Sequence, residues 1–302
     1  MSRKIRIATV SMARQFRDIR TPKDNFKYLD ETLAEIAHID PDITVLPEIF
    51  PVAGIKWENR DTIPDQGKDQ LRKWAQQHNT SMVGSLYEER NGSLYNTSLM
   101  MKRDGEIAGR YDKIHPNEPE IRQGITPGSL KQKPVETEFG KVGMQICFDA
   151  NWKDDWVNLA EQGAELVLFS SAYPGGQILN SIALLNQIFI VPSIIPLYSG
   201  IINNTGEWIV RTDRFSWWVW SDINLDRTVF HRDFQIEKIS GIREKYGGRI
   251  KVETFGEEAL FTLEPMDEDV CIDHVIREFE LVTYRNYLSR AAEAQEKGRR
   301  GC

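Results

Sequence analysis

The first candidate for a catalytic nucleophile is a cysteine at the end of an apolar run. Cys147 follows GMQI at 143–146 and precedes a stretch that we expect to begin a helix. A strand-to-helix turn places a side chain at the carboxyl edge of a sheet, where open α/β sheets bind ligands. Helix amides near such a turn favour a thiolate. A buried core cysteine is the other interpretation, because cysteine is common in protein cores.

A carboxylate occupies an equally apolar stretch. Glu48 follows ITVL at 43–46 and a proline, and IFP follows it at 49–51. An ionised carboxylate in such surroundings is costly unless it is paired or used. Burial favours its protonated form, which suits a general acid or base near neutral pH. A helix cap or a structural ion pair is the alternative.

A lysine and a second glutamate complete this set of candidate residues. Lys113 lies in GRYDKIHP at 109–116, where the aromatic and apolar neighbours predict a strand end that points inward. Glu120 follows seven residues later and can orient the ammonium group. A lysine on a solvated surface is the alternative, because most lysines are exposed.

The elements that must position these residues alternate between strands and helices. Apolar runs and alternating patterns predict strands at 5–10, 43–46, 81–87, 94–101, 142–146, 166–169 and 188–195. Apolar residues three and four apart predict helices at 24–38, 69–78, 156–162 and 178–187. Hairpins are predicted around 91–92 and 204–206. This alternation indicates an α/β layered domain with a mixed sheet.

The last third of the chain has a weaker pattern. Residues 213–248 show no clear periodicity, and we expect an irregular covering segment there. Residues 279–297 again have a helical pattern, and its last turns are polar enough to be exposed or to reach a partner subunit. We therefore expect one domain over residues 1–270 and a helical C-terminal extension over residues 271–302.

The composition argues against several classes of protein. The 302 residues are 40% hydrophobic and 27% charged, which is ordinary globular usage, and the net charge of −7 argues against nucleic acid or an anionic membrane as the main partner. No apolar run reaches the roughly 18 residues of a membrane span, and the first residues lack the pattern of a signal peptide. The three cysteines are too scattered for a disulfide framework or a zinc site. We expect a cytoplasmic enzyme.

Three segments stand in the order and spacing of the nitrilase superfamily of carbon–nitrogen hydrolases. They are LPEIF at 46–50, YDKIH at 111–115 and GMQICFD at 143–149. The segments at 159–166 and 199–207 resemble later parts of the same family, so that the resemblance covers roughly residues 3–210. True nitrilases tend to carry Trp-Glu after the cysteine. Phe148 and Asp149 in these positions look more like the amidase and carbamoylase branches.

This resemblance implies an αββα sandwich with a catalytic Glu48, Lys113 and Cys147, and with Glu120 as the family's second glutamate. Glu48 would take the thiol proton, and Cys147 would attack an amide, carbamoyl or nitrile carbon. Lys113 and the N–H of Phe148 would stabilise the oxyanion, each donor by roughly 3 kcal/mol. Ammonia or an amine would leave, and water would hydrolyse the thioester. The resemblance also implies a small-molecule substrate and no metal or cofactor, and it favours a homodimer or a larger homo-oligomer.

Four further side chains are candidates for the substrate pocket. Phe148 adjoins the nucleophile, and Tyr173 follows a buried strand. Trp152 lies in ANWKDD at 150–155, where many members of the family continue to a Pro-Glu pair. His115 lies two residues beyond Lys113, which on a strand puts both side chains on one face.

Three alternatives remain open at this point. One is a thiol enzyme that pairs Cys147 with His115. The second is a nitrilase or an acyl-transferring member of the same superfamily. The third is a catalytically silent subunit that only binds a ligand.

Overall fold

The computed structural model describes residues 3–12, 21–55 and 64–301. These form two compact units, a larger one over Ile5–Ile223 and a smaller one made of Met1–Lys4 and Asn224–Cys302. The domain boundary that we expected after residue 270 therefore lies inside the smaller unit. The reason is that the segment after Ile223 builds a hydrophobic core of its own.

The first sheet of the larger unit has six strands in the order β12-β1-β2-β3-β4-β5. Their bounds are β1 (Lys4–Val10), β2 (Ile43–Val45), β3 (Ser81–Arg90), β4 (Ser93–Met101), β5 (Ile107–Asp112) and β12 (Trp218–Asn224). Strands β1, β2 and β3 are parallel, and β3, β4 and β5 form antiparallel hairpins. Asn91 and Gly92 both have positive φ angles in the predicted turn between β3 and β4.

The second sheet also has six strands, in the order β11-β10-β9-β8-β7-β6. Their bounds are β6 (Val135–Thr137), β7 (Gly140–Ile146), β8 (Leu166–Ser171), β9 (Phe189–Ile194), β10 (Gly200–Ile202) and β11 (Trp208–Arg211). Strands β7, β8 and β9 are parallel, so their carboxyl ends meet at one edge.

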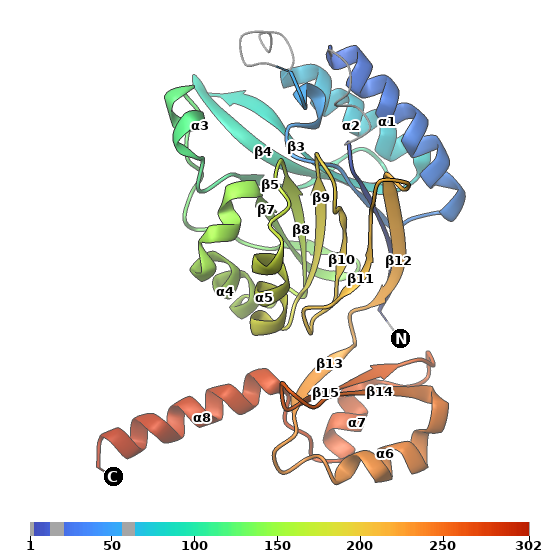
Figure 1. The fold of residues 1–302 in the computed structure, drawn as a ribbon, viewed down its shortest axis with the longest axis vertical. Helices are drawn as coiled ribbons and strands as arrows, with labels where there is room; N and C mark the ends of the chain where they lie inside the picture. Colours follow the sequence, from blue (N-terminus) through green and yellow to red (C-terminus); the bar gives the residue numbers. More distant parts are fainter. Residues whose placement is uncertain (1–2, 13–20, 56–63, 302) are drawn as a thin grey trace. The chain divides into compact units, whose positions relative to one another are not determined.

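The two sheets face each other through small hydroxyl side chains. Thr9 Oγ1 donates to the carbonyl of Pro192 at 2.8 Å, and Ser193 Oγ donates to the carbonyl of Val10 at 2.7 Å. Helices α1 (Pro22–Ile36) and α2 (Pro64–His78) cover the outer face of the first sheet, and α4 (Lys153–Glu161) and α5 (Gln177–Asn186) cover that of the second (Figure 1). The predicted αββα sandwich is confirmed.

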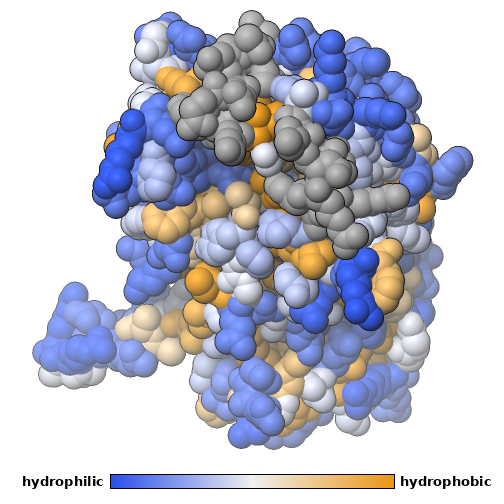
Figure 2. Space-filling model, turned by 45° about the horizontal axis from the view of Figure 1, so that its top comes forward, coloured by the Kyte–Doolittle hydropathy of each residue, from blue (hydrophilic) through white to orange (hydrophobic). Residues whose placement is uncertain are grey.

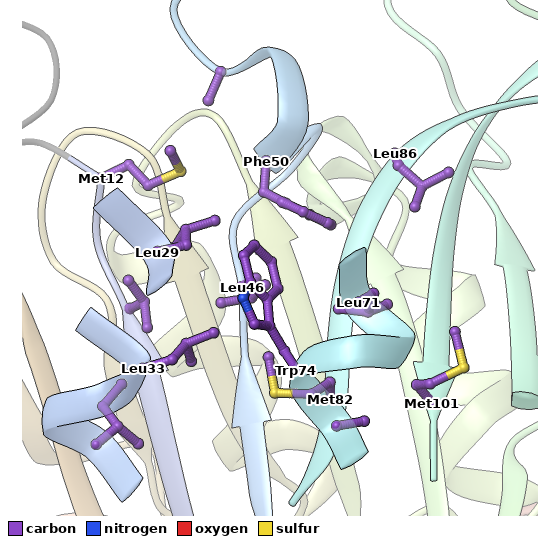
Figure 3. Close-up of a cluster of buried hydrophobic side chains, with 14 of the residues drawn as sticks. Met12, Leu29, Leu33, Leu46, Phe50, Leu71, Trp74, Met82, Leu86 and Met101 are labelled. Carbon is purple, nitrogen blue, oxygen red and sulfur yellow. The ribbon is translucent and has the colours of Figure 1, made fainter. Parts of the chain in front are cut away.

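The core beneath α1 and α2 is centred on Trp74. Figure 3 shows Leu29 and Leu33 of α1 on one side of this indole and Leu71 and Met82 on the other. The ring of Phe50, which follows the site segment after β2, lies 5.8 Å from that of Trp74. Packing of this kind anchors the segment that carries Glu48.

The strands and helices predicted between residues 5 and 210 are present, with ends shifted by a few residues. The prediction for residues 213–248 was wrong, because they contain β12, β13 (Thr228–His231) and α6 (Lys238–Tyr246). Strand β12 lies at a sheet edge and is only partly buried, so it lacks the apolar alternation of an inner strand.

The smaller unit contains a three-stranded antiparallel sheet in the order β13-β15-β14. The remaining elements are β14 (Ile250–Phe255), β15 (Leu260–Pro265), α7 (Ile272–Glu278) and α8 (Tyr284–Arg299). Its core includes Phe230, Ile242, Phe261, Leu263 and Val275. Helix α8, at the place of the helix predicted over 279–297, buries none of its residues.

Hydrophilic side chains predominate on the face drawn in Figure 2, and hydrophobic ones gather there in small patches. Among the helices of residues 3–12, 21–55 and 64–301, none has the length and apolar character needed to cross a membrane.

Gly128 is expected to tolerate no side chain, because a Cβ there would lie 2.2 Å from the carbonyl oxygen of Asp112. Its N–H also donates to the carbonyl of Lys113 at 2.8 Å. We predict that Gly128→Ala lowers the free energy of unfolding by about 1–3 kcal/mol, measured by urea titration. Gly256→Ala, where the new Cβ meets open space, is the control and should change stability by less than about 0.5 kcal/mol. Equal stability of the two variants would contradict the clash.

Candidate active site

The four residues singled out as catalytic lie at the ends of elements from both sheets. Glu48 follows β2, and Cys147 follows β7 directly. Lys113 follows β5, and Glu120 lies in the short helix α3 (Glu118–Arg122). All four side chains are buried, and they form one cluster.

The ammonium of Lys113 is the centre of this cluster. Its Nζ lies 2.8 Å from Oε1 of Glu48 and 2.7 Å from Oε2 of Glu120, and only 1% of its side chain is exposed. Burial by itself lowers the pKa of Lys113. The negative charges of Glu48 and Glu120 outweigh burial, and the pKa of Lys113 is raised above its ordinary value. Lys113 therefore stays charged at neutral pH.

Three donors orient the carboxylate of Glu48. Its Oε1 accepts hydrogen bonds from Lys113 Nζ and from Asn96 Nδ2, both at 2.8 Å. Its Oε2 accepts the backbone N–H of Ala172, directly after β8, at 2.9 Å. Both lone pairs of Oε1 accept hydrogen bonds. Oε2 accepts one hydrogen bond and has a second lone pair that can accept a proton.

Cys147 has a φ of 49° at the start of the short 3₁₀ helix Cys147–Asn151. A left-handed conformation is unfavourable for a residue with a side chain and is typical of functional sites. Burial raises the pKa of the thiol, the charge of Glu48 raises it further, and Lys113 opposes both. These causes oppose the thiolate that we expected from nearby helix amides, because the sulfur is buried and a carboxylate lies beside it. The raised pKa favours the protonated thiol, so a nucleophilic role for Cys147 would require a base.

Asp149 is a site residue that the sequence did not single out. Its carboxylate accepts hydrogen bonds from the Tyr111 hydroxyl and the His115 N–H, both at 2.8 Å, and from the Ile146 N–H at 3.0 Å. It thus joins the segment that carries Lys113 to the turn that carries Cys147. Burial raises the pKa of Asp149 to about 6, although these hydrogen bonds oppose the rise.

The proposed pocket residues fall into two groups. Phe148 and Trp152 are partly exposed, and their rings meet edge-on at 5.0 Å. The ring of His115 stacks on Trp152 at 4.0 Å, and its Nε2 lies 2.7 Å from Asp155. Tyr173 follows Ala172 and has no ring contact with this stack among the described residues, and burial raises the pKa of its hydroxyl.

Asn96 is the second residue that sequence reasoning missed. The signal available in the sequence was a run of three polar residues, Asn96, Thr97 and Ser98, within a predicted strand. All three are fully buried in the structure. Within the part of the chain that the structure describes, no three His, Cys, Asp or Glu side chains are arranged to hold a metal ion.

Comparison with known proteins places this geometry in a family. The profile described as Carbon-nitrogen hydrolase matches residues 6–221. The chain belongs to the carbon–nitrogen hydrolase family. The resemblance to the nitrilase superfamily drawn from the three motifs is thereby confirmed, and the matched region ends close to Ile223, where the larger unit ends.

Among relatives of this carbon–nitrogen hydrolase are amidases. A deaminated glutathione amidase of Mus musculus is 27% identical over 169 residues, which cover 50% of this chain and 52% of that protein. An omega-amidase of Homo sapiens is 26% identical over 232 residues, which cover 68% and 84% of the two chains. The chain spans about half the length of several deaminated glutathione amidases that it matches, and about a fifth of a nitrilase and fragile histidine triad fusion protein of Drosophila melanogaster.

Solved structures share the fold of the larger unit. A carbon-nitrogen hydrolase from Helicobacter pylori G27 matches with a TM-score of 0.65 and 19% identity, and covers 81% of this chain and 94% of that one. The amidase from Nesterenkonia sp. AN1, with acrylamide added at its active-site cysteine, matches with a TM-score of 0.63 and 20% identity. That match covers 79% of this chain and 99% of the other.

The raised pKa of Asp149 predicts a specific pH dependence of stability. Its folded-state pKa of about 6 exceeds the ordinary 3.8, so the folded protein holds this proton more tightly than the unfolded chain. The stabilisation is complete below about pH 4 and is lost as the pH rises through 6. Relative to Asp149→Asn, the wild type should lose about 3 kcal/mol of unfolding free energy between pH 4 and 7.

Urea titrations at pH 4, 5.5 and 7 measure this difference. Asp69→Asn removes an exposed carboxylate and serves as the control for a change of surface charge. Parallel pH curves for the wild type and Asp149→Asn would show that the buried carboxylate does not titrate as described.

Proposed function

We propose that this chain hydrolyses the carbon–nitrogen bond of a small linear amide or N-carbamoyl amine, releasing ammonia, through a thioester on Cys147. The observation that carries the proposal is a buried ammonium, Lys113, held between Glu48 and Glu120 beside that thiol. Such a cluster supplies a nucleophile, a base and a fixed positive charge in one place. The amidase relatives support the choice of reaction.

In the acylation step, Oε2 of Glu48 takes the thiol proton while Sγ of Cys147 attacks the carbonyl carbon. The resulting oxyanion is stabilised by Lys113 Nζ and the N–H of Phe148. Both oxygens of Glu120 contact the same Nζ, so one bifurcated hydrogen can satisfy that carboxylate and another can serve the oxyanion. The intermediate then collapses, the C–N bond breaks, and Glu48 returns the proton to the leaving nitrogen.

In the deacylation step, the same groups act on water. Glu48 accepts a proton from the water as its oxygen attacks the thioester carbon. The C–S bond breaks, and the sulfur of Cys147 recovers the proton. The products are a carboxylic acid, or a carbamate from a carbamoyl substrate, and the free enzyme. The base is regenerated in each half-reaction, so no cofactor is required.

The aromatic group of Phe148 and Trp152 supports a role as one wall of the acyl pocket, with His115 behind it and Tyr173 as a separate wall residue. A Cys–His enzyme is less well supported, because the ring of His115 is engaged by Trp152 and Asp155. A nitrile as substrate, or acyl transfer to an acceptor other than water, would use the same cluster and is an alternative outcome of the substrate screen below.

We further propose a cytoplasmic homodimer or larger homo-oligomer. Exposed apolar side chains on the two outer helices of the second sheet support this assembly. They are Val157 of α4 and Ile178 and Leu185 of α5, which are 40%, 42% and 71% exposed. Light scattering after size exclusion tests it, and a monomer at micromolar concentration would count against it.

The first test is ammonia release from a panel of amides, ureido acids and nitriles. We expect turnover of at least one amide or ureido acid, and we expect Cys147→Ala to lower it by roughly 10⁴-fold or more. Cys271→Ala, at an exposed free cysteine, is the control and should retain wild-type activity. Activity of a folded Cys147→Ala protein would remove the nucleophile from the mechanism.

The second test separates the base from the neighbouring histidine. Glu48→Gln keeps size and hydrogen bonding but cannot accept a proton, so acylation should fall by roughly 10²–10⁴-fold. His115→Asn should act chiefly on affinity, because this ring supports Trp152 and not the thiol. Single-turnover acyl-enzyme formation distinguishes the two. The opposite pattern, with acylation lost in His115→Asn and retained in Glu48→Gln, would replace the mechanism by the Cys–His alternative.

A further inference from the structure

We propose that Asn96 is a positioning residue that holds Glu48 and Glu120 in the one arrangement in which Glu48 can accept the thiol proton. The inference rests on the function proposed above. Asn96 lies in β4 and is fully buried. Its Nδ2 donates to Oε1 of Glu48 at 2.8 Å and to Oε1 of Glu120 at 3.2 Å. One –NH₂ group thus uses both of its hydrogens on the two carboxylates.

A serine on the neighbouring strand fixes the direction of this amide. Ser85 Oγ in β3 accepts the N–H of Ile49 at 2.7 Å, and it donates its own hydrogen to Oδ1 of Asn96 at 3.0 Å. Because Oδ1 is held by that hydrogen, the –NH₂ group faces the carboxylates. A flipped amide would place Oδ1 against two negative charges and would leave the Ser85 hydroxyl facing an –NH₂ group.

Glu48 and Glu120 need such a donor because they share one ammonium and repel each other. A neutral –NH₂ between them donates to both carboxylates and adds no charge that competes with Lys113. It also occupies the second lone pair on Oε1 of Glu48, which leaves Oε2 for the thiol proton. The backbone carbonyl of Asn96 accepts the backbone N–H of Lys113 at 2.8 Å, so Asn96 also holds the chain that carries the ammonium.

The experiment measures the pH dependence of kcat/KM and of the alkylation of Cys147 by iodoacetamide, followed by intact mass. Loss of the amide removes a hydrogen-bond donor from Oε1 of Glu48, which faces Lys113, Glu120 and the thiol. In Asn96→Ala, the acidic limb of both profiles should therefore move to higher pH. At pH 7 we expect kcat to fall roughly 10- to 100-fold, with KM changed by less than about threefold.

Two serine variants complete the test. Ser85→Ala leaves the –NH₂ group present but not oriented, so its acidic limb should move the same way, with a fall in kcat of roughly 3- to 10-fold. Ser98→Ala is the matched control. Ser98 is fully buried and pairs with Ser85 across the two strands, but its hydroxyl contacts Met144 Sδ at 3.6 Å. Its acidic limb should stay at the wild-type position.

An unmoved acidic limb in both Asn96→Ala and Ser85→Ala overturns the proposal even if kcat falls, because a loosened core lowers kcat without moving the limb. An equal shift in Ser98→Ala overturns it as well. If Asn96→Ala does not fold, Ser85→Ala decides by the same criterion. The alkylation profile needs no substrate. A wild type that hydrolyses no amide or ureido acid therefore contradicts the proposed function, while alkylation still tests Asn96.

Discussion

A charged ammonium held out of water is the constraint on which the arrangement of this site depends. Removing Lys113 from solvent carries a penalty of several kcal/mol, which is offset only if its partners are close and well oriented. Glu48 and Glu120 meet that condition, at 2.8 and 2.7 Å. Loss of one partner from such a buried group typically destabilises a protein by roughly 3–5 kcal/mol. The three residues therefore behave as one unit, and the backbone around them must deliver all three together.

The sandwich brings Glu48 and Cys147 together because each follows a strand with parallel neighbours, β2 in one sheet and β7 in the other, while Lys113 and Glu120 come from the end of β5 and from α3. The hydroxyl of Ser170 in β8 donates to the carbonyl of Leu46 at 2.8 Å, which joins the two sheets where the segment with Glu48 begins. Ile49 and Cys147 both adopt left-handed conformations, with φ of 43° and 49°. The surrounding hydrogen bonds hold these turns, and Asp149 contributes three of them. Strain is thus retained where the thiol of Cys147 and the carboxylate of Glu48 face each other.

Much of this arrangement could be predicted from local sequence. Cys147, Glu48 and Lys113 each lie just after an apolar or strand-like run. Such a run predicts a strand from local sequence alone, so the residue that follows it is predicted to lie at a strand end. Asn96 and Asp149 could not be found in this way, because their contacts are formed between segments far apart in the chain. Asp149 lies in the turn after β7, and its hydrogen-bond partners lie at the end of β5. These segments come together only because the two sheets pack face to face.

The state of the thiol and the domain boundary were missed for related reasons. The pKa of Cys147 depends on the charge of Glu48, which lies on the other sheet and cannot be placed from the cysteine's own neighbours. The position of the domain boundary depends on which apolar residues pack into the same hydrophobic core. Phe230 and Phe261 stack at 5.1 Å in the smaller unit, although the sequence around them shows no composition change that would mark a linker.

The most direct measurement of the central claim is a rapid-quench experiment on the wild-type enzyme with an amide that it turns over. The reaction is stopped with acid, and the protein is digested and analysed by mass spectrometry. The mechanism predicts a transient acyl group, of the mass of the substrate less ammonia, on the peptide that contains Cys147, and it predicts that this species forms and decays at rates compatible with turnover. Turnover with no such adduct, or with an adduct on another residue, would contradict covalent catalysis by this cluster.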